Sequence, residues 1–159
     1  MLTHNLGYPR IGSHRELKKA SEMYWSGKTT ARNLFQVARS LRIEHWRIQK
    51  EAGIDLIPSN DFSFYDHVLD MSLMVGAIPL RYHDVIFNNK NSEMDLYFAM
   101  ARGYQKDDLD ITALEMTKWF DTNYHYMVPE FHRDQQFRLF SNKVIDEFYE
   151  AKELAQGKS

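Results

Sequence analysis

The strongest constraint on the fold is a long amphipathic helical pattern that stops at a glycine and is followed at once by a short apolar run. The pattern begins at Thr29 or Thr30 and continues to Ala52, with apolar residues at helical spacing on one face. Gly53 then ends the helix, and residues 54–58, Ile-Asp-Leu-Ile-Pro, are typical of a strand buried on both faces. Helix, glycine and strand in that order indicate an α/β unit.

Other stretches of the chain repeat this alternation. Helices are predicted at about 14–26, from a cap at 59–61 to about residue 73, at 93–102 and at 142–156. The main strands are predicted at 5–10, 54–58 and 114–120, although the last could form a helical turn. A small strand is expected at 137–140, and loops are expected at 81–91, 104–110 and 123–131. Strands separated by helices favour a parallel sheet, and three strands cannot close a barrel, so we expect an unfinished, helix-rich α/β fold.

The composition argues against several classes of protein, namely nucleic-acid-binding, disulfide-bonded and membrane-spanning ones. The chain has 159 residues, enough for one domain, and its 20 basic and 22 acidic side chains are interspersed, which gives no global field for nucleic acid or anionic lipid. It has no cysteine, hence no disulfide or zinc thiolate, in keeping with a reducing compartment. The N-terminus has no apolar signal region, and the longest apolar stretch, 71–80, is too short for a membrane span. We therefore expect a soluble, cytoplasmic protein with no nucleic-acid or membrane partner.

Basic residues surround the predicted start of the first helix. Ser13 and Glu16 have the spacing of a capping box there, and the free N–H groups and the dipole of a helix start attract anions. Arg15 and Lys18 are three residues apart and share a helix face. The cluster suits phosphates or a chain of carboxylates, although an exposed charged helix is the simpler interpretation. Its members are Arg10, Arg15, Lys18 and Lys19.

A second candidate cation and several acidic and histidine residues lie farther along the chain. Lys118 is at or near the end of a predicted parallel strand, where α/β folds bind ligands, or it points into solvent. Asp61, Asp66 and His67 could be metal ligands or an acid–base pair, but Asp61 is more simply a helix cap and the other two are neighbours that point in different directions. His125 lies between two tyrosines, where packing is the usual role. Residue chemistry alone thus predicts an α/β segment with one anion site.

Three separated runs of the sequence are more specific than the single residues discussed above. They are LGYPRIG at 6–12 with RELKKA at 15–20, DFSFYDHVL at 61–69, and EMTKWFDTNYHY at 115–126. In order and spacing they resemble the beginning of the cobalamin-independent methionine synthases. The resemblance extends over nearly the whole chain and is weakest between Arg81 and Asp110.

The resemblance implies both a fold and a role. Members of that family transfer a methyl group from 5-methyltetrahydropteroyltriglutamate to homocysteine, using two facing (βα)8 TIM barrels and a zinc ion in the C-terminal one. Residues 1–159 would then form the first βα units of the N-terminal barrel, with about three short parallel strands. Carried over position by position, the contacts to the folate polyglutamate fall on Arg15, Glu16, Leu17, Lys18 and Lys118. No catalytic residue and no zinc ligand fall within this chain.

The same resemblance implies what this part of the enzyme lacks. The zinc and homocysteine sites belong to the C-terminal barrel of the same polypeptide, so we expect the chain to bind no cofactor and to be inactive by itself. The alternative is a scaffold piece without ligand binding, which would expose an unpaired strand edge and apolar faces and would self-associate. A phosphate-binding barrel enzyme is disfavoured because the sequence has no glycine-rich phosphate loop.

Overall fold

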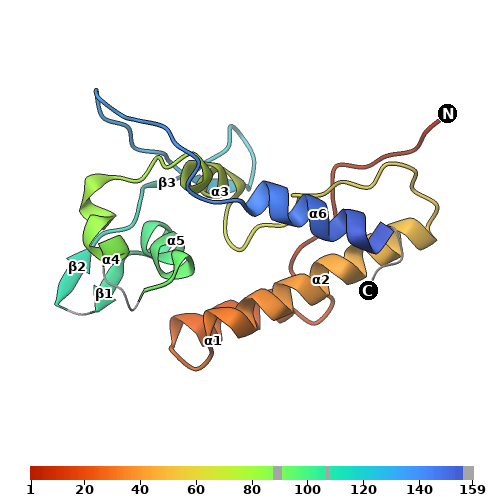
Figure 1. Cartoon of the computed structure of the whole chain (residues 1–159), viewed down its shortest axis with the longest axis horizontal. Helices are drawn as coiled ribbons and strands as arrows, with labels where there is room; N and C mark the ends of the chain where they lie inside the picture. The colour runs from red at the N-terminus through yellow and green to blue at the C-terminus, as the bar shows by residue number, and fades with distance from the viewer. Residues whose placement is uncertain (88–90, 107, 156–159) are drawn as a thin grey trace. The chain divides into compact units, whose positions relative to one another are not determined.

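The computed structural model describes residues 1–87, 91–106 and 108–155 and is rich in helix (Figure 1). The chain divides into two compact units. Unit 1 contains residues 1–64 together with those from 143 onward, and unit 2 contains residues 65–142. The two regions that carry the predicted ligand contacts therefore fall in different units, Arg15 to Lys18 in unit 1 and Lys118 in unit 2.

Unit 1 is built on α1 (Glu16–Trp25), α2 (Ala31–Glu51) and α6 (Lys143–Ala155). Thr30 caps α2 by accepting a hydrogen bond from the backbone N–H of Asn33, and Gly53, at φ +79°, follows its end. The sequence had predicted a start at Thr29 or Thr30 and an end at Gly53, and both are confirmed. The apolar faces of α1 and α2 meet the segment after α2 in one core, formed by Leu17, Ala38, Leu41 and Phe62 with Val37 and Phe64 at its edge.

Buried ion pairs join α6 to α2. The guanidinium of Arg42, which is 9% exposed, lies 2.7 Å from the carboxylate of Glu150 and 3.6 Å from that of Glu147. Lys143 lies 3.2 Å from Glu147 and donates a hydrogen bond of 2.8 Å to the carbonyl of Phe62. These contacts fix the N-terminal half of α6, from Lys143 to Glu150, against the rest of unit 1. The helix predicted at 142–156 is confirmed through Ala155, and residue 156 lies outside the described residues.

Unit 2 combines short helices with two hairpins. Its elements are α3 (His67–Met74), η1 (Leu80–Tyr82), α4 (His83–Phe87), α5 (Glu93–Arg102), β1 (Tyr104–Lys106), β2 (Leu109–Ile111), β3 (Met116–Lys118) and β4 (His125–Met127). The α5 helix has the predicted bounds, because Ser92 and Asp95 form a capping box and Gly103, at φ +85°, ends it. The largest fully buried side chains of this unit include Leu69, Tyr82, Val85, Met100 and Met127.

The predicted segment of a parallel (βα)8 barrel is wrong. Among the described residues both sheets are two-stranded and antiparallel, β1 with β2 and β3 with β4. The strands of each pair are close together in the sequence, and so short a connection can only join antiparallel neighbours, since a parallel pair needs a crossover of about a dozen residues or more. The predicted third strand thus exists at Met116–Lys118, but its partner is a segment that was expected to be a loop.

The expected first and second strands, at 5–10 and 54–58, do not form; one isolated parallel bridge pairs Leu56 with His4, the residue before the first of them. Leu56 N–H donates to the carbonyl of Thr3 at 3.0 Å. The Asp55 carboxylate takes up the N–H and the hydroxyl of Thr3, at 2.8 and 2.9 Å, and Pro58 has no N–H to offer. Residues 54–58 therefore lack the backbone hydrogen-bond ladder expected of a strand, because the Asp55 side chain binds Thr3 and Pro58 cannot donate.

Several element boundaries also differ from the predictions. The third helix begins at His67 with Asp66 as its cap, so residues 61–66 are not helical. The first helix begins at Glu16 without the predicted Ser13 cap. Tyr104–Lys106 and Leu109–Ile111 pair as strands where a loop was expected, 81–87 are helical, and 137–140 hydrogen-bond to the end of α3 in place of forming a strand. Residues 88–90 and 107 of the predicted loops lie outside the described part of the chain.

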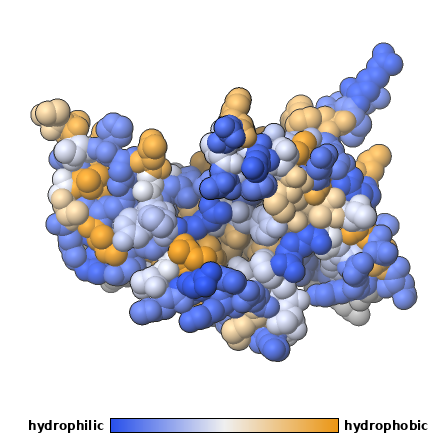
Figure 2. Space-filling view, turned by 180° about the vertical axis from the view of Figure 1, so that it is seen from behind, coloured by the Kyte–Doolittle hydropathy of each residue, from blue (hydrophilic) through white to orange (hydrophobic). Residues whose placement is uncertain are grey.

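Exposed apolar side chains occur in both units. Figure 2 shows them as orange areas set among hydrophilic residues. In unit 1 they include Phe35, Leu56 and Phe148, and in unit 2 they include Phe120, Phe131, Phe137 and Leu139. Within the described residues, no helix is long and apolar enough to cross a membrane.

Candidate functional site

The loop before α1 is held in a fixed path by side chains from the rest of unit 1. The backbone N–H of Tyr8 donates to the Asp61 carboxylate at 2.8 Å, and the Tyr8 ring stacks on His45 with a centroid distance of 4.4 Å. Burial lowers the pKa of His45, which favours its neutral form. Gly7 has φ +136°, and a Cβ there would lie 2.7 Å from the Cβ of Asp61, so this close approach requires glycine.

Gly12 and Glu16 shape the turn that leads into α1. A Cβ on Gly12, whose φ is +82°, would lie 2.1 Å from Glu16 Oε2 and 2.9 Å from Leu41 Cδ2. The Glu16 carboxylate folds back over the turn and accepts the N–H of His14 at 3.0 Å. The pKa of Glu16 is lowered chiefly by hydrogen bonding to its own backbone N–H and then to that of His14. Glu16 therefore stabilises the helix start that Ser13 was predicted to cap.

Arg15 and Lys18 are exposed at this helix start. Arg15 has φ +62°, a left-handed conformation that is uncommon outside glycine and that concentrates at functional positions. Lys18 lies 3.6 Å from Glu22 in a pair that is about half exposed. Leu17, in contrast, is 3% exposed and belongs to the core, and its N–H donates to the Ile11 carbonyl at 3.2 Å. The cationic side chains, more than free helix N–H groups, make this surface attractive to an anion.

The other predicted basic residues flank this surface. Lys19 is exposed on α1. Arg10 is half-buried in the loop before it.

Lys118 is the last paired residue of β3. It lies opposite His125 of β4, and its side chain is exposed. Exposed aromatic rings follow it: Trp119 is 46% exposed and packs edge-on against Tyr126, and Phe120 is 82% exposed with φ +52°. A cation beside exposed rings can contact both the charged and the aromatic parts of one ligand.

Asp66 is the centre of a buried hydrogen-bond network beneath this hairpin. Its side chain is 1% exposed; Oδ2 accepts the N–H of Leu69 at 2.9 Å and that of Met127 at 3.1 Å, and Oδ1 accepts the hydroxyl of Tyr124. The hydroxyl of Tyr97 accepts the N–H of Asp66 at 3.2 Å. One carboxylate therefore caps α3 and holds two positions of the hairpin that carries Lys118.

The remaining candidates from the sequence have structural roles in these surroundings. Asp61 fixes the loop at Gly7 and Tyr8 in place of capping a helix. His67 Nδ1 lies 4.0 Å from the Asp70 carboxylate, and His125 Nδ1 lies 3.0 Å from the Asn123 carbonyl. Residues 1–87, 91–106 and 108–155 contain no group of three or more His, Asp and Glu side chains placed to hold a metal ion.

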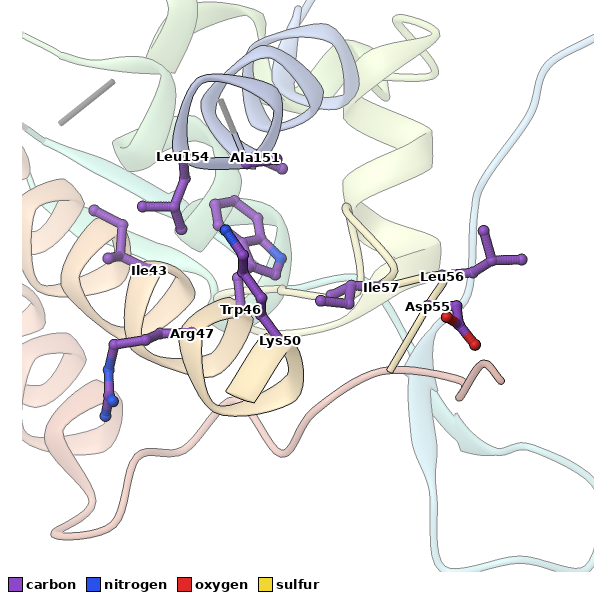
Figure 3. Close-up of a pocket in the computed structure, with 10 residues that line it drawn as sticks. Ile43, Trp46, Arg47, Lys50, Asp55, Leu56, Ile57, Ala151 and Leu154 are labelled. Atoms are coloured by element: carbon purple, nitrogen blue, oxygen red, sulfur yellow. The ribbon is translucent and has the colours of Figure 1, made fainter. Parts of the chain in front are cut away.

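A separate apolar groove lies in unit 1. It encloses about 490 Å³ and is lined by α2, by residues 55–57 and by the end of α6. Figure 3 shows Ile43, Trp46 and Leu154 filling the space between α2 and α6, with Arg47 directed away from it. The indole N–H of Trp46 donates to the Pro58 carbonyl at 3.1 Å. The groove was not foreseen from the sequence, because three separate segments line it.

Comparison with known proteins identifies the family of this chain. Residues 2–158 match the family "Cobalamin-independent synthase, N-terminal domain". The chain belongs to this family. The motifs that carried the resemblance, at 6–20, 61–69 and 115–126, all lie within the matched range.

Individual relatives of this N-terminal domain are similar over almost the whole chain. They include proteins of Flavobacterium johnsoniae, 64% identical over 95% of the chain, and of Cytophaga hutchinsonii, 62% over 96%. A protein of Saccharomyces cerevisiae is 55% identical over 94% of the chain. All three are named 5-methyltetrahydropteroyltriglutamate–homocysteine methyltransferase. The chain spans 19–20% of the length of these relatives, about a fifth.

Proposed function

We propose that this chain serves a methyltransferase that moves a methyl group from 5-methyltetrahydropteroyltriglutamate to homocysteine, and that its own part is to bind the triglutamate tail. The names of the relatives support the reaction, and the family match supports the chain's place as the N-terminal domain. The ligand contacts are Arg15 and Lys18 in unit 1 and Lys118 in unit 2. The enzyme's other partner is the C-terminal domain of the same polypeptide.

The main support for tail binding is the left-handed backbone of Arg15 and the fixed loop that precedes it. Asp61, His45 and two glycines fix the preceding loop, and the chain accepts a left-handed arginine at the helix start. Such a conformation persists only where surrounding contacts impose it. As a result, Arg15 at the N-cap and Lys18 in the first turn of α1 are both exposed, where carboxylates of the tail can reach them.

The expected energies are modest and salt-dependent. Each exposed ion pair with a glutamate carboxylate should contribute about 0–1 kcal/mol and weaken as salt screens it. The existing pair between Lys18 and Glu22 is also exposed, so a ligand carboxylate can replace it at little cost. Several such contacts along one tail give a preference for the triglutamate over the monoglutamate.

Glu16 and Leu17 support this surface without using their side chains as cation partners. Leu17 anchors the helix in the core, and Glu16 closes the turn through the N–H of His14. We assign them to positioning the two cations between which they lie.

Zinc chemistry does not fit the residues of this chain. The sequence has no cysteine, and the described residues bring no metal-binding group together. We therefore assign activation of the homocysteine thiol to the C-terminal domain. The chain alone should form no methionine from the folate and homocysteine, and detectable product from the purified chain would contradict this assignment.

A titration with lysine variants tests tail binding. Calorimetry with the triglutamate folate should show that Lys18→Ala and Lys118→Ala each weaken binding by about two- to fivefold. Lys28→Ala, an exposed lysine just beyond α1, and Lys106→Ala, an exposed lysine on the other hairpin, are matched controls that should bind normally. Equal affinity of all five proteins would refute the assignment.

A scaffold without ligand binding is the second candidate. The apolar groove between α2 and α6 and the exposed Phe131, Phe137 and Leu139 favour it, because such surfaces promote association. It predicts no heat on titration with the folate and a molar mass by light scattering that rises with concentration. A concentration-independent monomer that binds the triglutamate would exclude it.

A further inference from the structure

The buried carboxylate of Asp66 in unit 2 has no assigned part in the function. Its two oxygens accept hydrogen bonds from Leu69, Met127 and Tyr124, and it is 1% exposed. A cap for α3 needs only the bond from Leu69. The bonds from Met127 and Tyr124 join the carboxylate to residues about sixty positions away, on and beside β4.

The geometry points to Asp66 and Tyr124 as a positioning pair that holds the β3–β4 hairpin so that Lys118 faces the ligand. This inference rests on the proposed function, because it concerns the same ligand contact. Lys118 pairs with His125, the residue after Tyr124, and Trp119 N–H donates to the Tyr124 carbonyl at 2.8 Å. Tyr124 is therefore bonded by its hydroxyl to α3 and by its carbonyl to the residue that follows Lys118.

The chemistry of the pair favours a fixed orientation. A buried carboxylate binds its donors through charge-assisted hydrogen bonds, which are stronger and more directional than neutral ones. The N–H of Met127 and the hydroxyl of Tyr124 reach the two oxygens of one carboxylate from positions three residues apart. Two attachments prevent the short hairpin from pivoting, whereas three-residue strands by themselves give little rigidity.

The tyrosine variant provides the test, because it removes one hydroxyl and keeps the ring. Tyr124→Phe should accelerate amide hydrogen exchange at Trp119 and Met127 and weaken triglutamate binding by about two- to fivefold, as Lys118→Ala does. Tyr126→Phe, which removes a hydroxyl from the neighbouring strand position, is the matched control and should change neither quantity.

A double variant separates positioning from general stability. If Tyr124 acts through Lys118, Tyr124→Phe should cause no further loss of affinity in the Lys118→Ala background. An equal loss in both backgrounds, normal affinity of Tyr124→Phe alone, or unchanged hydrogen exchange would overturn the positioning role. Normal binding by Lys118→Ala would refute the proposed ligand contact itself, and the positioning role would fall with it. Loss from Lys118→Ala without loss from Tyr124→Phe would refute only the positioning pair.

Discussion

Replacing Gly12 by alanine tests whether the turn before α1 is built as tightly as the structure shows. The residue has φ +82°, and an added Cβ would meet Leu41 Cδ2 at 2.9 Å and Glu16 Oε2 at 2.1 Å. The Glu16 side chain can rotate away from the new methyl group. Leu41 belongs to the core and can retreat only by disturbing its packing.

The two costs can be stated separately. A left-handed backbone costs an alanine about 1–2 kcal/mol relative to glycine, and crowding a packed core by one methyl group costs about 1–3 kcal/mol. Gly12→Ala should therefore lower the free energy of unfolding by about 2–5 kcal/mol. Gly27 supplies the matched control, because its φ is +69° and nothing lies within 4 Å of a Cβ there. Gly27→Ala should show only the backbone cost.

Urea denaturation followed by circular dichroism measures both variants. With a slope of about 2 kcal/mol per molar urea, Gly12→Ala should shift the midpoint down by at least about 1 M, and Gly27→Ala by less. A Gly12→Ala midpoint at or above that of Gly27→Ala would show that the contact with Leu41 is not formed as described. Gly12→Ala should also weaken triglutamate binding, since the turn presents Arg15.

Three further changes test other parts of the structure. Tyr97→Phe removes the hydroxyl that donates to Asp70 at 2.7 Å and should cost about 1–3 kcal/mol of unfolding free energy in urea, whereas an unchanged midpoint would contradict the network. Because burial keeps the pKa of His45 below 6.5 in the folded chain, the unfolded chain takes up the proton more readily, so stability should fall as the pH drops below 6.5. His45→Phe should flatten that part of a urea-midpoint profile against pH, and an unaltered profile would assign the dependence elsewhere. Arg42→Ala removes the charge between the carboxylates of Glu147 and Glu150 and should cost about 3–5 kcal/mol by the same denaturation, with a cost under about 1 kcal/mol refuting a buried pair.

Local chemistry allowed the helices to be predicted well. Thr30 as a cap and Gly53 and Gly103 as stops act within a few residues of the helix ends they define, so the sequence alone indicates them. The start of α3 was misplaced because several capping residues precede it. Asp66, and not Asp61, caps α3 because Asp66 also binds distant residues, and no local sequence pattern shows those contacts.

The strands were predicted poorly for a related reason. Pro129 led us to expect a loop at 123–131, although Asp121, Thr122 and Asn123 are turn-forming residues between two β-prone runs and could have indicated the hairpin. The run 54–58 has the composition of a buried strand, but its pairing depends on which distant segment lies beside it.

The sequence predicted the cations of the proposed site but not the residues that support them. Residue chemistry indicated Arg15, Lys18 and Lys118 as candidates, the family resemblance assigned them to the polyglutamate, and their exposure agrees with a ligand contact. The residues that hold them, Asp61 for the first loop and Asp66 with Tyr124 for the hairpin, act through contacts across 53 and 58 positions. Such long-range pairs have no trace in spacing or periodicity.

The central proposal is that this chain binds a polyglutamate tail. Its most direct measurement is calorimetric titration of the chain with the monoglutamate and triglutamate forms of 5-methyltetrahydrofolate at low and high salt. Tail binding predicts that the triglutamate binds more tightly and that its advantage shrinks as salt rises from about 0.05 to about 0.5 M. Equal affinity for the two forms, or an advantage that salt leaves unchanged, would contradict it.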